Sequence, residues 1–449
     1  MGTTRRVATV ALAGLLTAVA VAGPAAADPE RTPIADWEPL PAATEVVVSA
    51  EAQALREQLL GEHWDDPNHV TLHWIGVSSF VITIGGHLLL FDAWEIIGAV
   101  EDYLPIGREE LAGLEPEAVL VGHGHFDHAG DLGYVAGLTG ATVVGSEEIC
   151  TVAQQGAERE GVSTDFPCAI TGTADTPAPG VAASFTLFSD VEPVTVLQHI
   201  HSAATPPGEH NQPDPFVPIM DPQPYIDHLM TNPEELIRFL AQNQESNQGG
   251  TWLYHLKDGD FTLVVGNSAG PIFDTPEVGA ALDAFPDCVD VLANAILGFD
   301  QPVSGLQDPV LYVAATHPRI FIPTHADAWA PVISAGQAQY ADELNADIDA
   351  AGLAFRPEVD LLVDPQDYLV ERAYRVDDPQ WSEPVPGSSC AAEGTSGAPS
   401  PAPTPTPTSA PSTTDDVAAE GADTPSTGGG LGIAALLAAG MAAAARRRR

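Results

Sequence analysis

The segment covering residues 121–131, with the sequence VGHGHFDHAGD, constrains the fold of this chain more than any other. The residues before it, 117–121, include β-branched side chains that predict a buried strand. Apolar residues at helical spacing follow at 129–138. The segment therefore lies where a strand ends and a helix begins, which is the usual place for a site in an α/β fold.

This segment contains the side chains that zinc-type metals prefer, namely imidazoles and a carboxylate. They are His123, His125, Asp127 and His128. In an extended turn His123 and His125 point to the same side, while Asp127 and His128 reach a neighbouring position. A lone histidine would be read as a polar loop residue or a helix cap, but this cluster favours metal binding. One short loop could thus hold two adjacent metals.

The HxHxDH spacing resembles the signature of the metallo-β-lactamase superfamily. Residues 72–92, LHWIGVSSFVITIGGHLLLFD, extend the resemblance towards the branch that includes the L-ascorbate-6-phosphate lactonase-like hydrolases. Strands are predicted at 70–75, 79–84 and 87–91, the last two joined by a tight hairpin at Gly85-Gly86. The resemblance covers roughly residues 70–330. It implies an α/β fold of the four-layer αββα sandwich type.

The resemblance also implies ligands outside the central segment. In the superfamily a histidine at a strand end completes the first metal site, and residues 193–201 (PVTVLQHIH) end in histidine. His201 fits this position best because Ser202 starts a loop, while His199 points to the same face and is the alternative. His325, in the sequence IPTHAD, resembles the last metal histidine. The first site would then use His201, and the second would use His325.

One position departs from the family pattern. The sequence GNSAG, residues 266–270, stands where relatives usually carry Gly-Asp, and that aspartate bridges the two metals. Here the aligned residue is Asn267, which could also be a simple turn asparagine. A neutral amide lacks the charge that holds two cations together. We therefore expect unequal sites, with the metal on His123, His125 and His201 held more tightly, and we expect Asn267→Asp to raise occupancy of the other.

Composition limits the possible partners. The chain has 449 residues, of which 45% are hydrophobic, so it can bury a large core. Its net charge is −46, from 62 acidic and 16 basic residues. Such a surface repels phosphate backbones and anionic lipids, and this excludes nucleic-acid binding. The simplest role for the charge is to keep an exported protein soluble, and the sequence leaves the oligomeric state open.

The ends of the chain differ in composition from its middle. Residues 1–27 have the positive start, apolar stretch and small-residue cleavage site of a signal peptide. An extension at 28–69 contains a predicted helix, 49–60, capped by Ser49. The predicted catalytic domain covers 70–386. Within it, residues 202–233 are predicted to form a long loop that walls a substrate pocket.

The C-terminal region is predicted to be a linker followed by an anchor. Residues 387–424 are mostly Pro, Thr, Ser, Ala and Gly, which cannot bury a core. The segment 425–449 contains an apolar run, 431–445, and four final arginines, 446–449. With Thr424 in place of the usual leucine, the order of TPSTG, apolar run and arginines resembles a sortase signal of Gram-positive surface proteins. The alternative is a plain tail anchor in the membrane. Either predicts a protein held at the cell surface, and otherwise a secreted one.

The four cysteines are Cys150, Cys168, Cys288 and Cys390. An exported chain allows disulfides. The most local pairing is Cys150 with Cys168, and Cys288 with Cys390 would fasten the end of the domain.

These features predict an exported metal-dependent hydrolase acting on a small-molecule ester, lactone, amide or phosphodiester. The expected cofactor is one or two zinc ions, with iron or manganese still open. A metal-bound hydroxide would attack the substrate. If only one metal binds, Asp127 would orient the hydroxide and pass a proton to the leaving group. The alternatives are an iron-dependent redox enzyme of the same fold and a surface-displayed binding protein with a degenerate site.

Overall fold

The computed structural model describes residues 30–99, 103–202, 223–273, 275–285, 289–298, 301–302, 306–327, 336–383 and 385. The predicted signal peptide, the linker, the C-terminal anchor segment, Cys288 and Cys390 lie outside these residues. No helix formed by the residues that are described is both long and apolar enough to cross a bilayer.

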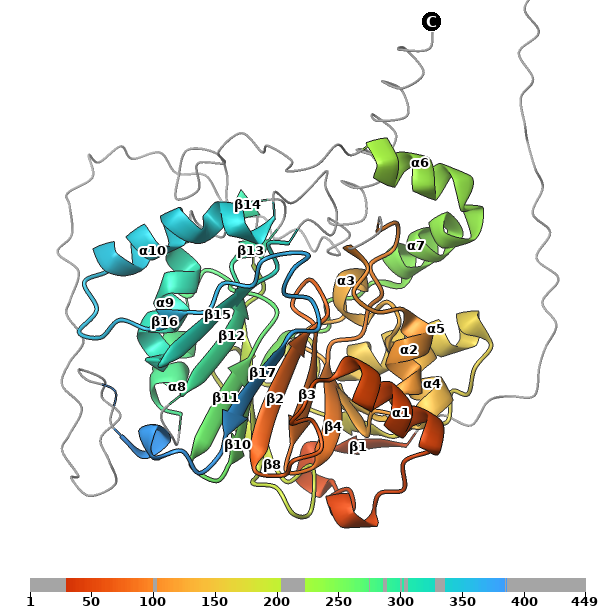
Figure 1. The fold of residues 1–449 in the computed structure, drawn as a ribbon, viewed down its shortest axis with the longest axis horizontal. Helices are drawn as coiled ribbons and strands as arrows, with labels where there is room; N and C mark the ends of the chain where they lie inside the picture. The colour runs from red at the N-terminus through yellow and green to blue at the C-terminus, as the bar shows by residue number, and fades with distance from the viewer. Residues whose placement is uncertain are drawn as a thin grey trace, which may run out of the picture.

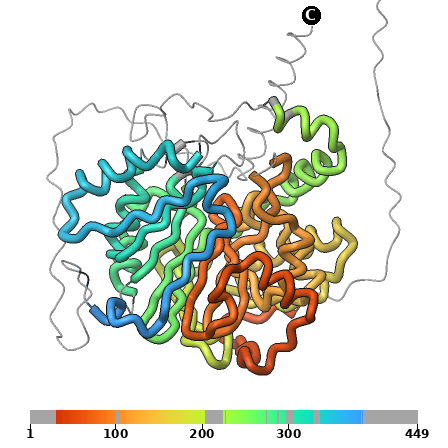
Figure 2. Tube along the Cα trace, viewed as in Figure 1, coloured from red at the N-terminus to blue at the C-terminus, as the bar shows by residue number. Residues whose placement is uncertain are grey.

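The described residues form two large β-sheets. The first sheet has eight strands in the order β1-β7-β6-β5-β4-β3-β2-β17. Their bounds are β1 Arg31–Pro33, β2 His69–Trp74, β3 Phe80–Ile84, β4 His87–Phe91, β5 Ala118–Leu120, β6 Thr142–Gly145, β7 Cys168–Ile170 and β17 Glu371–Arg375. The C-terminal strand β17 pairs antiparallel with β2, so the end of the domain closes the edge of its first sheet (Figure 2).

The second sheet has seven strands in the order β16-β15-β12-β11-β10-β9-β8. Their bounds are β8 Ala182–Phe185, β9 Val194–His199, β10 Thr251–Asp258, β11 Phe261–Val265, β12 Val291–Ala295, β15 Ile320–Thr324 and β16 Glu358–Val359. A separate pair joins β13 Leu297–Gly298 and β14 Gln301–Pro302.

Helices cover the outer face of each sheet, so the molecule has four layers (Figure 1). On the first sheet lie α1 Ala50–Leu59, α2 Arg108–Gly113, α4 Leu132–Thr139 and α5 Glu147–Glu160. On the second lie α8 Pro276–Asp283, α9 Gln307–Thr316 and α10 Ala341–Ala350. The short α3, Phe126–Ala129, and the pair α6 Gln223–Thr231 and α7 Pro233–Glu245 lie at one end of the sandwich. This is a mixed α/β fold with two sheets, consistent with the predicted αββα sandwich.

The main hydrophobic core lies between the sheets and extends under the helices of the first one. Phe91 on β4 meets Tyr254 on β10 edge to face, with ring centroids 6.3 Å apart. The Tyr254 hydroxyl donates to the carbonyl oxygens of Val121 and Val144, at 2.9 and 3.0 Å. A buried tyrosine of the second sheet thus satisfies its own polar atom on the first, which fixes how the two sheets meet.

Two local predictions are confirmed. The hairpin between β3 and β4 turns at Gly85 and Gly86, whose φ angles of 57° and 86° suit residues without a Cβ. Helix α1 begins after Ser49, whose side chain accepts a hydrogen bond from the Ala52 N–H at 3.0 Å.

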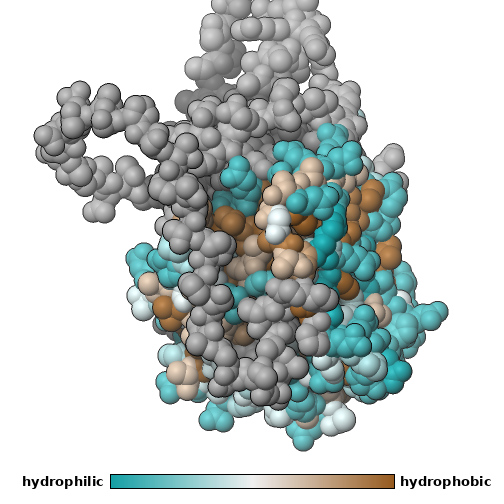
Figure 3. Space-filling model, turned by 90° about the vertical axis from the view of Figure 1, so that its left-hand side faces the viewer, coloured by the Kyte–Doolittle hydropathy of each residue, from teal (hydrophilic) through white to brown (hydrophobic). Residues whose placement is uncertain are grey.

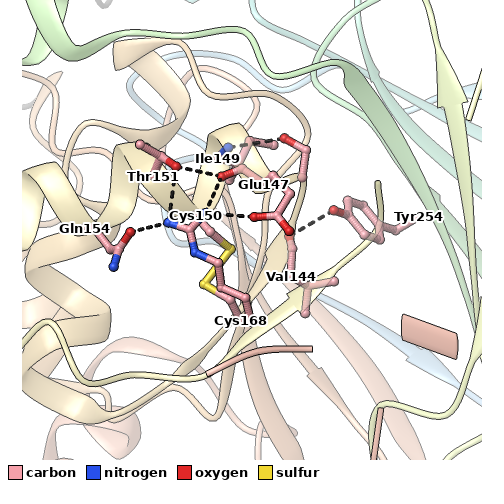
Figure 4. Close-up of a disulfide and its surroundings, with 10 residues drawn as sticks. Val144, Glu147, Ile149, Cys150, Thr151, Gln154, Cys168 and Tyr254 are labelled. Atoms are coloured by element: carbon pink, nitrogen blue, oxygen red, sulfur yellow. Dashed lines mark hydrogen bonds and ion pairs between the residues drawn. A yellow bond between two sulfur atoms is a disulfide. The ribbon is translucent and has the colours of Figure 1, made fainter. Parts of the chain in front are cut away.

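The predicted N-terminal extension contributes to the first sheet, because β1 pairs in parallel with β7. The Arg31 guanidinium on β1 donates to Glu147 at 2.8 Å and also bonds Thr151 and Gln154, all on α5. The Cys150–Cys168 disulfide joins the same helix to β7, which confirms the local pairing (Figure 4). Strand β1 and helix α5 are therefore fastened to the same sheet edge.

Two predicted segments differ from the structure. Residues 223–231 were expected in a loop but form α6, because Tyr225 and Leu229 bury against Phe126 and Phe239. The sequence pattern also predicts strands at 359–363 and 367–375, but the observed strands are shorter, since only Glu358–Val359 and Glu371–Arg375 find pairing partners. In both cases packing or pairing with distant residues determines the secondary structure, and a local sequence pattern does not contain this information.

Hydrophilic residues cover much of the described surface on the face that Figure 3 shows. This agrees with the large excess of acidic over basic residues in the chain.

Candidate metal centre

Five loops that follow strands meet at one end of the sandwich. The strands β4 and β5 run parallel in the first sheet, and β11, β12 and β15 run parallel in the second. Strand β9 has the same direction as β11, because both are antiparallel to β10. Residues that follow these strands at their carboxyl ends therefore lie together, as is usual for sites in α/β folds. They include Asp92 after β4, His123 after β5, His201 after β9, Asn267 after β11 and His325 after β15.

Three histidines form the first cluster. The Nε2 atom of His123 lies 3.0 Å from Nδ1 of His125 and 3.1 Å from Nε2 of His201. Their nearest ligand atoms fall within 4.8 Å of one another, as a metal site requires. His123 is only 2% exposed. The structure thus brings together the three histidines that the sequence assigned to one metal.

Asp127, His128 and His325 form the second cluster. The Nε2 atom of His325 lies 3.2 Å from Nε2 of His128 and 3.4 Å from the Asp127 carboxylate. The rings of His123 and His128 lie with centroids 4.3 Å apart, so the two clusters adjoin. The backbone N–H of His325 donates to the Val77 carbonyl at 2.9 Å, which holds the strand end of the second sheet against the first.

The hydrogen bonds of these histidines show that the donor set fits a cation. The Nδ1 atom of His123 donates to the Asn267 side-chain oxygen at 2.8 Å, and Nδ1 of His201 donates to the Ser202 carbonyl at 2.5 Å. A neutral imidazole carries one N–H, so the two Nε2 atoms that face each other both present lone pairs. Lone pairs 3.1 Å apart repel unless a cation lies between them. His128 also donates through Nδ1, to Asp92 at 2.8 Å, and its Nε2 is directed at Nε2 of His325.

Burial and neighbouring charge divide the clusters. Burial, together with the other histidines, lowers the pKa of His123 and of His201 well below the usual value. Burial also lowers the pKa of His125 to about 4. Burial opposes the charged form of Asp127 too, but His128 and His325 outweigh it and lower that pKa. For His128, burial is outweighed by Asp127 and Asp92, which raise its pKa. The imidazoles of the first cluster are therefore neutral at pH 7 and ready to bind a metal.

The loop that carries His123 and His125 is tied to the second sheet. The Gly122 carbonyl accepts from the Trp252 N–H at 2.7 Å, and the Gly124 N–H donates to the Gln248 carbonyl at 2.9 Å. A Cβ on Gly122 would lie 2.3 Å from the Asn267 side chain, and one on Gly124 would lie 2.2 Å from a backbone oxygen. Glycine is required at both positions because this loop approaches Asn247 and Asn267 so closely.

The alternative ligand His199 lies elsewhere. It is the last residue of β9, and its Nδ1 lies 2.8 Å from the Tyr312 hydroxyl on α9. Burial lowers its pKa to about 3. Strand β9 ends there, the chain turns, and His201 reaches the cluster. The structure therefore brings His201, and not His199, to the cluster.

Asn267 and Asp92 hydrogen-bond to each other and to one histidine of each cluster. Asn267 is 1% exposed, and its amide bonds His123 on one side and Asp92 on the other. The family resemblance places Asn267 at a metal position, whereas no sequence pattern assigns a role to Asp92. The only available signal for Asp92 was its place at the end of a predicted strand, which in the structure is the direct neighbour of the strand before the histidine segment.

Residues 73–210 match the model of the metallo-beta-lactamase superfamily. This match includes the first five candidate ligands and ends before Asn267 and His325. A "UPF0173 metal-dependent hydrolase" of Pyrobaculum arsenaticum is 35% identical over 86 residues, which are 19% of this chain and 36% of that protein. Another from Methylacidiphilum infernorum is 29% identical over 139 residues, 31% of this chain and 52% of that protein. The chain thus spans about a third to a half of the length of these relatives.

Solved structures are similar at lower identity. The metallo hydrolase Igni18 of Ignicoccus hospitalis is 16% identical with a TM-score of 0.39, covering 68% of this chain and 98% of that one. The diiron beta-hydroxylase CmlA of Streptomyces venezuelae is 12% identical with a TM-score of 0.35, covering 68% of this chain and 54% of that one.

Proposed function

We propose that this protein is a metal-dependent hydrolase whose centre is formed by the two adjoining clusters. The observation that carries the proposal is the set of imidazole lone pairs that converge at about 3 Å with their other nitrogens already donating. Such a geometry suits a cation and is costly without one. The relatives described as metal-dependent hydrolases support the same reading.

Each candidate ligand has a separate role in this proposal. His123, His125 and His201 would hold one metal, and Asp127, His128 and His325 would hold the other. A divalent ion of the zinc type lowers the pKa of a bound water to about 7 and so supplies a nucleophile at neutral pH. Should the second position stay empty, the Asp127 carboxylate is the group that would orient the water and pass a proton to the leaving group.

We propose zinc as the metal and a small molecule with an ester, lactone, amide or phosphodiester bond as the substrate. Imidazole and carboxylate donors also suit iron and manganese, so the element is to be measured. The net charge of −46 disfavours nucleic acid as a substrate.

We also propose that the protein is exported and held at the cell surface. Support comes from the sequence of residues 1–27 and 425–449 and from the Cys150–Cys168 disulfide, since disulfides persist in oxidising compartments. Cell fractionation tests this. Full-length protein released into the medium, or extracted by detergent with its C-terminal arginines intact, would contradict wall anchoring.

The test of activity uses protein purified without added metal. Its metal content is measured, and hydrolysis is then screened on a panel of the four bond types with and without chelator. We expect at least one equivalent of a transition metal and an activity that the chelator removes and zinc restores. Metal-free protein that gains no activity from zinc, iron or manganese would favour a binding protein with a degenerate site.

A further inference from the structure

Asn267 connects a donor and an acceptor at the centre of the site. Its Oδ1 lies 2.8 Å from Nδ1 of His123, and its Nδ2 lies 2.8 Å from Oδ2 of Asp92. A carboxylate only accepts hydrogen bonds, so the Asn267 nitrogen must face Asp92 and its oxygen must face His123. The proton of His123 is then fixed on Nδ1, and its Nε2 is left for a metal.

Asp92 accepts three hydrogen bonds in full burial. Its Oδ1 accepts from the Gly122 N–H at 2.9 Å, and its Oδ2 accepts from Asn267 Nδ2 and from His128 Nδ1, each at 2.8 Å. The residue is 0% exposed. An asparagine there would place an N–H against a donor, so a carboxylate alone satisfies all three partners.

The pair Asn267–Asp92 therefore orients one histidine of each cluster. His123 of the first cluster donates to the Asn267 amide oxygen, and His128 of the second cluster donates to the Asp92 carboxylate. The same loop also holds His201, because the Ser268 hydroxyl accepts from the Ser202 N–H at 2.8 Å and the Gly270 N–H donates to the Ile200 carbonyl at 3.0 Å.

We propose that Asn267 is a positioning residue and not a metal ligand: with Asp92 it fixes the Nδ1–H tautomers of His123 and His128 and couples the two clusters. This inference rests on the proposed function, since it assigns a role within that metal site. It replaces the expectation that Asn267 stands between the metals as a weaker substitute for a bridging carboxylate.

The proposal changes the expected effect of Asn267→Asp. The new carboxylate would meet Asp92 where the amide nitrogen now donates, and two carboxylates in contact repel unless one takes up a proton or turns away. We therefore expect Asn267→Asp to weaken metal binding at the first cluster, where a bridging role would predict a gain at the second.

The first measurement is the tautomer of each histidine in the metal-free full chain, by NMR of isotope-labelled imidazole nitrogens. We expect Nδ1–H for His123 and His128 in the wild type. Asn267→Ala should release His123 and leave His128 fixed, because Asp92 still accepts from it. Asp92→Asn should release both. A His123 tautomer that is unchanged in Asn267→Ala would overturn the proposal.

The second measurement is metal affinity of each cluster taken alone, by zinc titration. His325→Ala leaves the first cluster complete, and His201→Ala leaves the second. Removing such a supporting partner usually lowers metal affinity roughly 10- to 100-fold. We expect this loss for Asn267→Ala in the His325→Ala background and little change in the His201→Ala background. A loss confined to the second cluster would identify Asn267 as a ligand there.

Asn294 on β12 supplies the matched control. It is also a buried asparagine, 1% exposed, and neither of its amide atoms has a hydrogen-bond partner in the described structure. Asn294→Ala should leave both tautomers and both affinities unchanged. Equal effects of the two substitutions would overturn the proposal by showing that only packing matters. If the wild type bound no metal, the proposed function would fail, while the tautomers would still test the role of Asn267.

Discussion

The two ligand clusters adjoin but differ in charge. The first consists of His123, His125 and His201, which contribute no carboxylate, and its supporting groups are the neutral Asn267 amide and the Ser202 carbonyl. The second contains the Asp127 carboxylate, and its His128 is supported by the Asp92 carboxylate. The negative charge of the site is therefore concentrated on one side. The number of ligands alone therefore does not rank the metal affinities of the two positions, because buried charges next to the ligands contribute as well.

The largest effect is expected when one cluster is broken. The double variant His123→Ala and His125→Ala leaves only His201 of the first cluster, so its metal should be lost and turnover should fall to the uncatalysed background. Metal content after dialysis and hydrolysis of the best substrate from the panel measure this. Retention of the full wild-type metal content would contradict the assignment of these ligands.

The order in which the two clusters bind zinc tests this comparison directly. The sequence alone favoured the cluster of three histidines, but the placement of Asp92 adds a second carboxylate to the other. Since opposite charges near 4 Å attract by several kcal/mol even at an effective dielectric constant of about 20, we expect the Asp127 cluster to bind zinc roughly tenfold or more tightly. Titration of His201→Ala against His325→Ala measures the ratio. Tighter binding by His325→Ala would restore the sequence-based order.

Removing the Cys150–Cys168 disulfide tests whether the stability of the fold and the order of metal binding are independent. It closes a loop with a sequence separation of 18 on the first sheet, and neither cysteine is a candidate ligand. The double Cys→Ala variant should lose about 3 kcal/mol of unfolding free energy, the value expected for a loop of this size. Denaturant unfolding measures the loss, and thiol titration of the unreduced wild type should find this pair oxidised. A changed order of metal filling in this variant would show that the comparison depends on the scaffold.

The smallest effect concerns a buried histidine outside the clusters. His87 bonds Glu117 through Nδ1 at 2.7 Å and Asp190 through Nε2 at 2.8 Å. Burial opposes its charged form, but the two carboxylates outweigh this and raise its pKa. Because the folded pKa lies above the usual value of about 6.5, this stabilisation is complete below that pH and is lost as pH rises through the raised pKa.

The variant His87→Gln should therefore be most destabilised, relative to wild type, at acidic pH, and the difference should shrink as pH rises. Unfolding free energies of both proteins across this range measure it. A difference that grows with pH would show that His87 is buried in its neutral form, like the histidines of the first cluster.

Local sequence predicted the parts of the molecule whose partners lie nearby in the chain. The Ser49 cap, the Gly85-Gly86 hairpin and the cluster of His123, His125, Asp127 and His128 each depend on residues only a few positions apart. Spacing and side-chain chemistry are enough to recognise such features. The more distant His201 and His325 came from resemblance to a family.

Which of His199 and His201 lies in the first cluster depends on the folded chain. Side chains two positions apart share a face of a strand, so the sequence could not separate them. The end of β9 at His199 turns one side chain towards Tyr312 and the other into the cluster. Helix α6 is a similar case, because its helical state depends on burial against Phe126 and Phe239.

The residues that can bind a metal are recognisable from the sequence, because ligand chemistry belongs to the side chain and its immediate neighbours. The residues that hydrogen-bond to these side chains become known only from the folded chain. Asp92 and Asn267 are 175 positions apart and meet through a 2.8 Å hydrogen bond between the two sheets. The proposed orientation of the histidines depends on this contact, and no local pattern encodes a contact between residues so far apart in the chain.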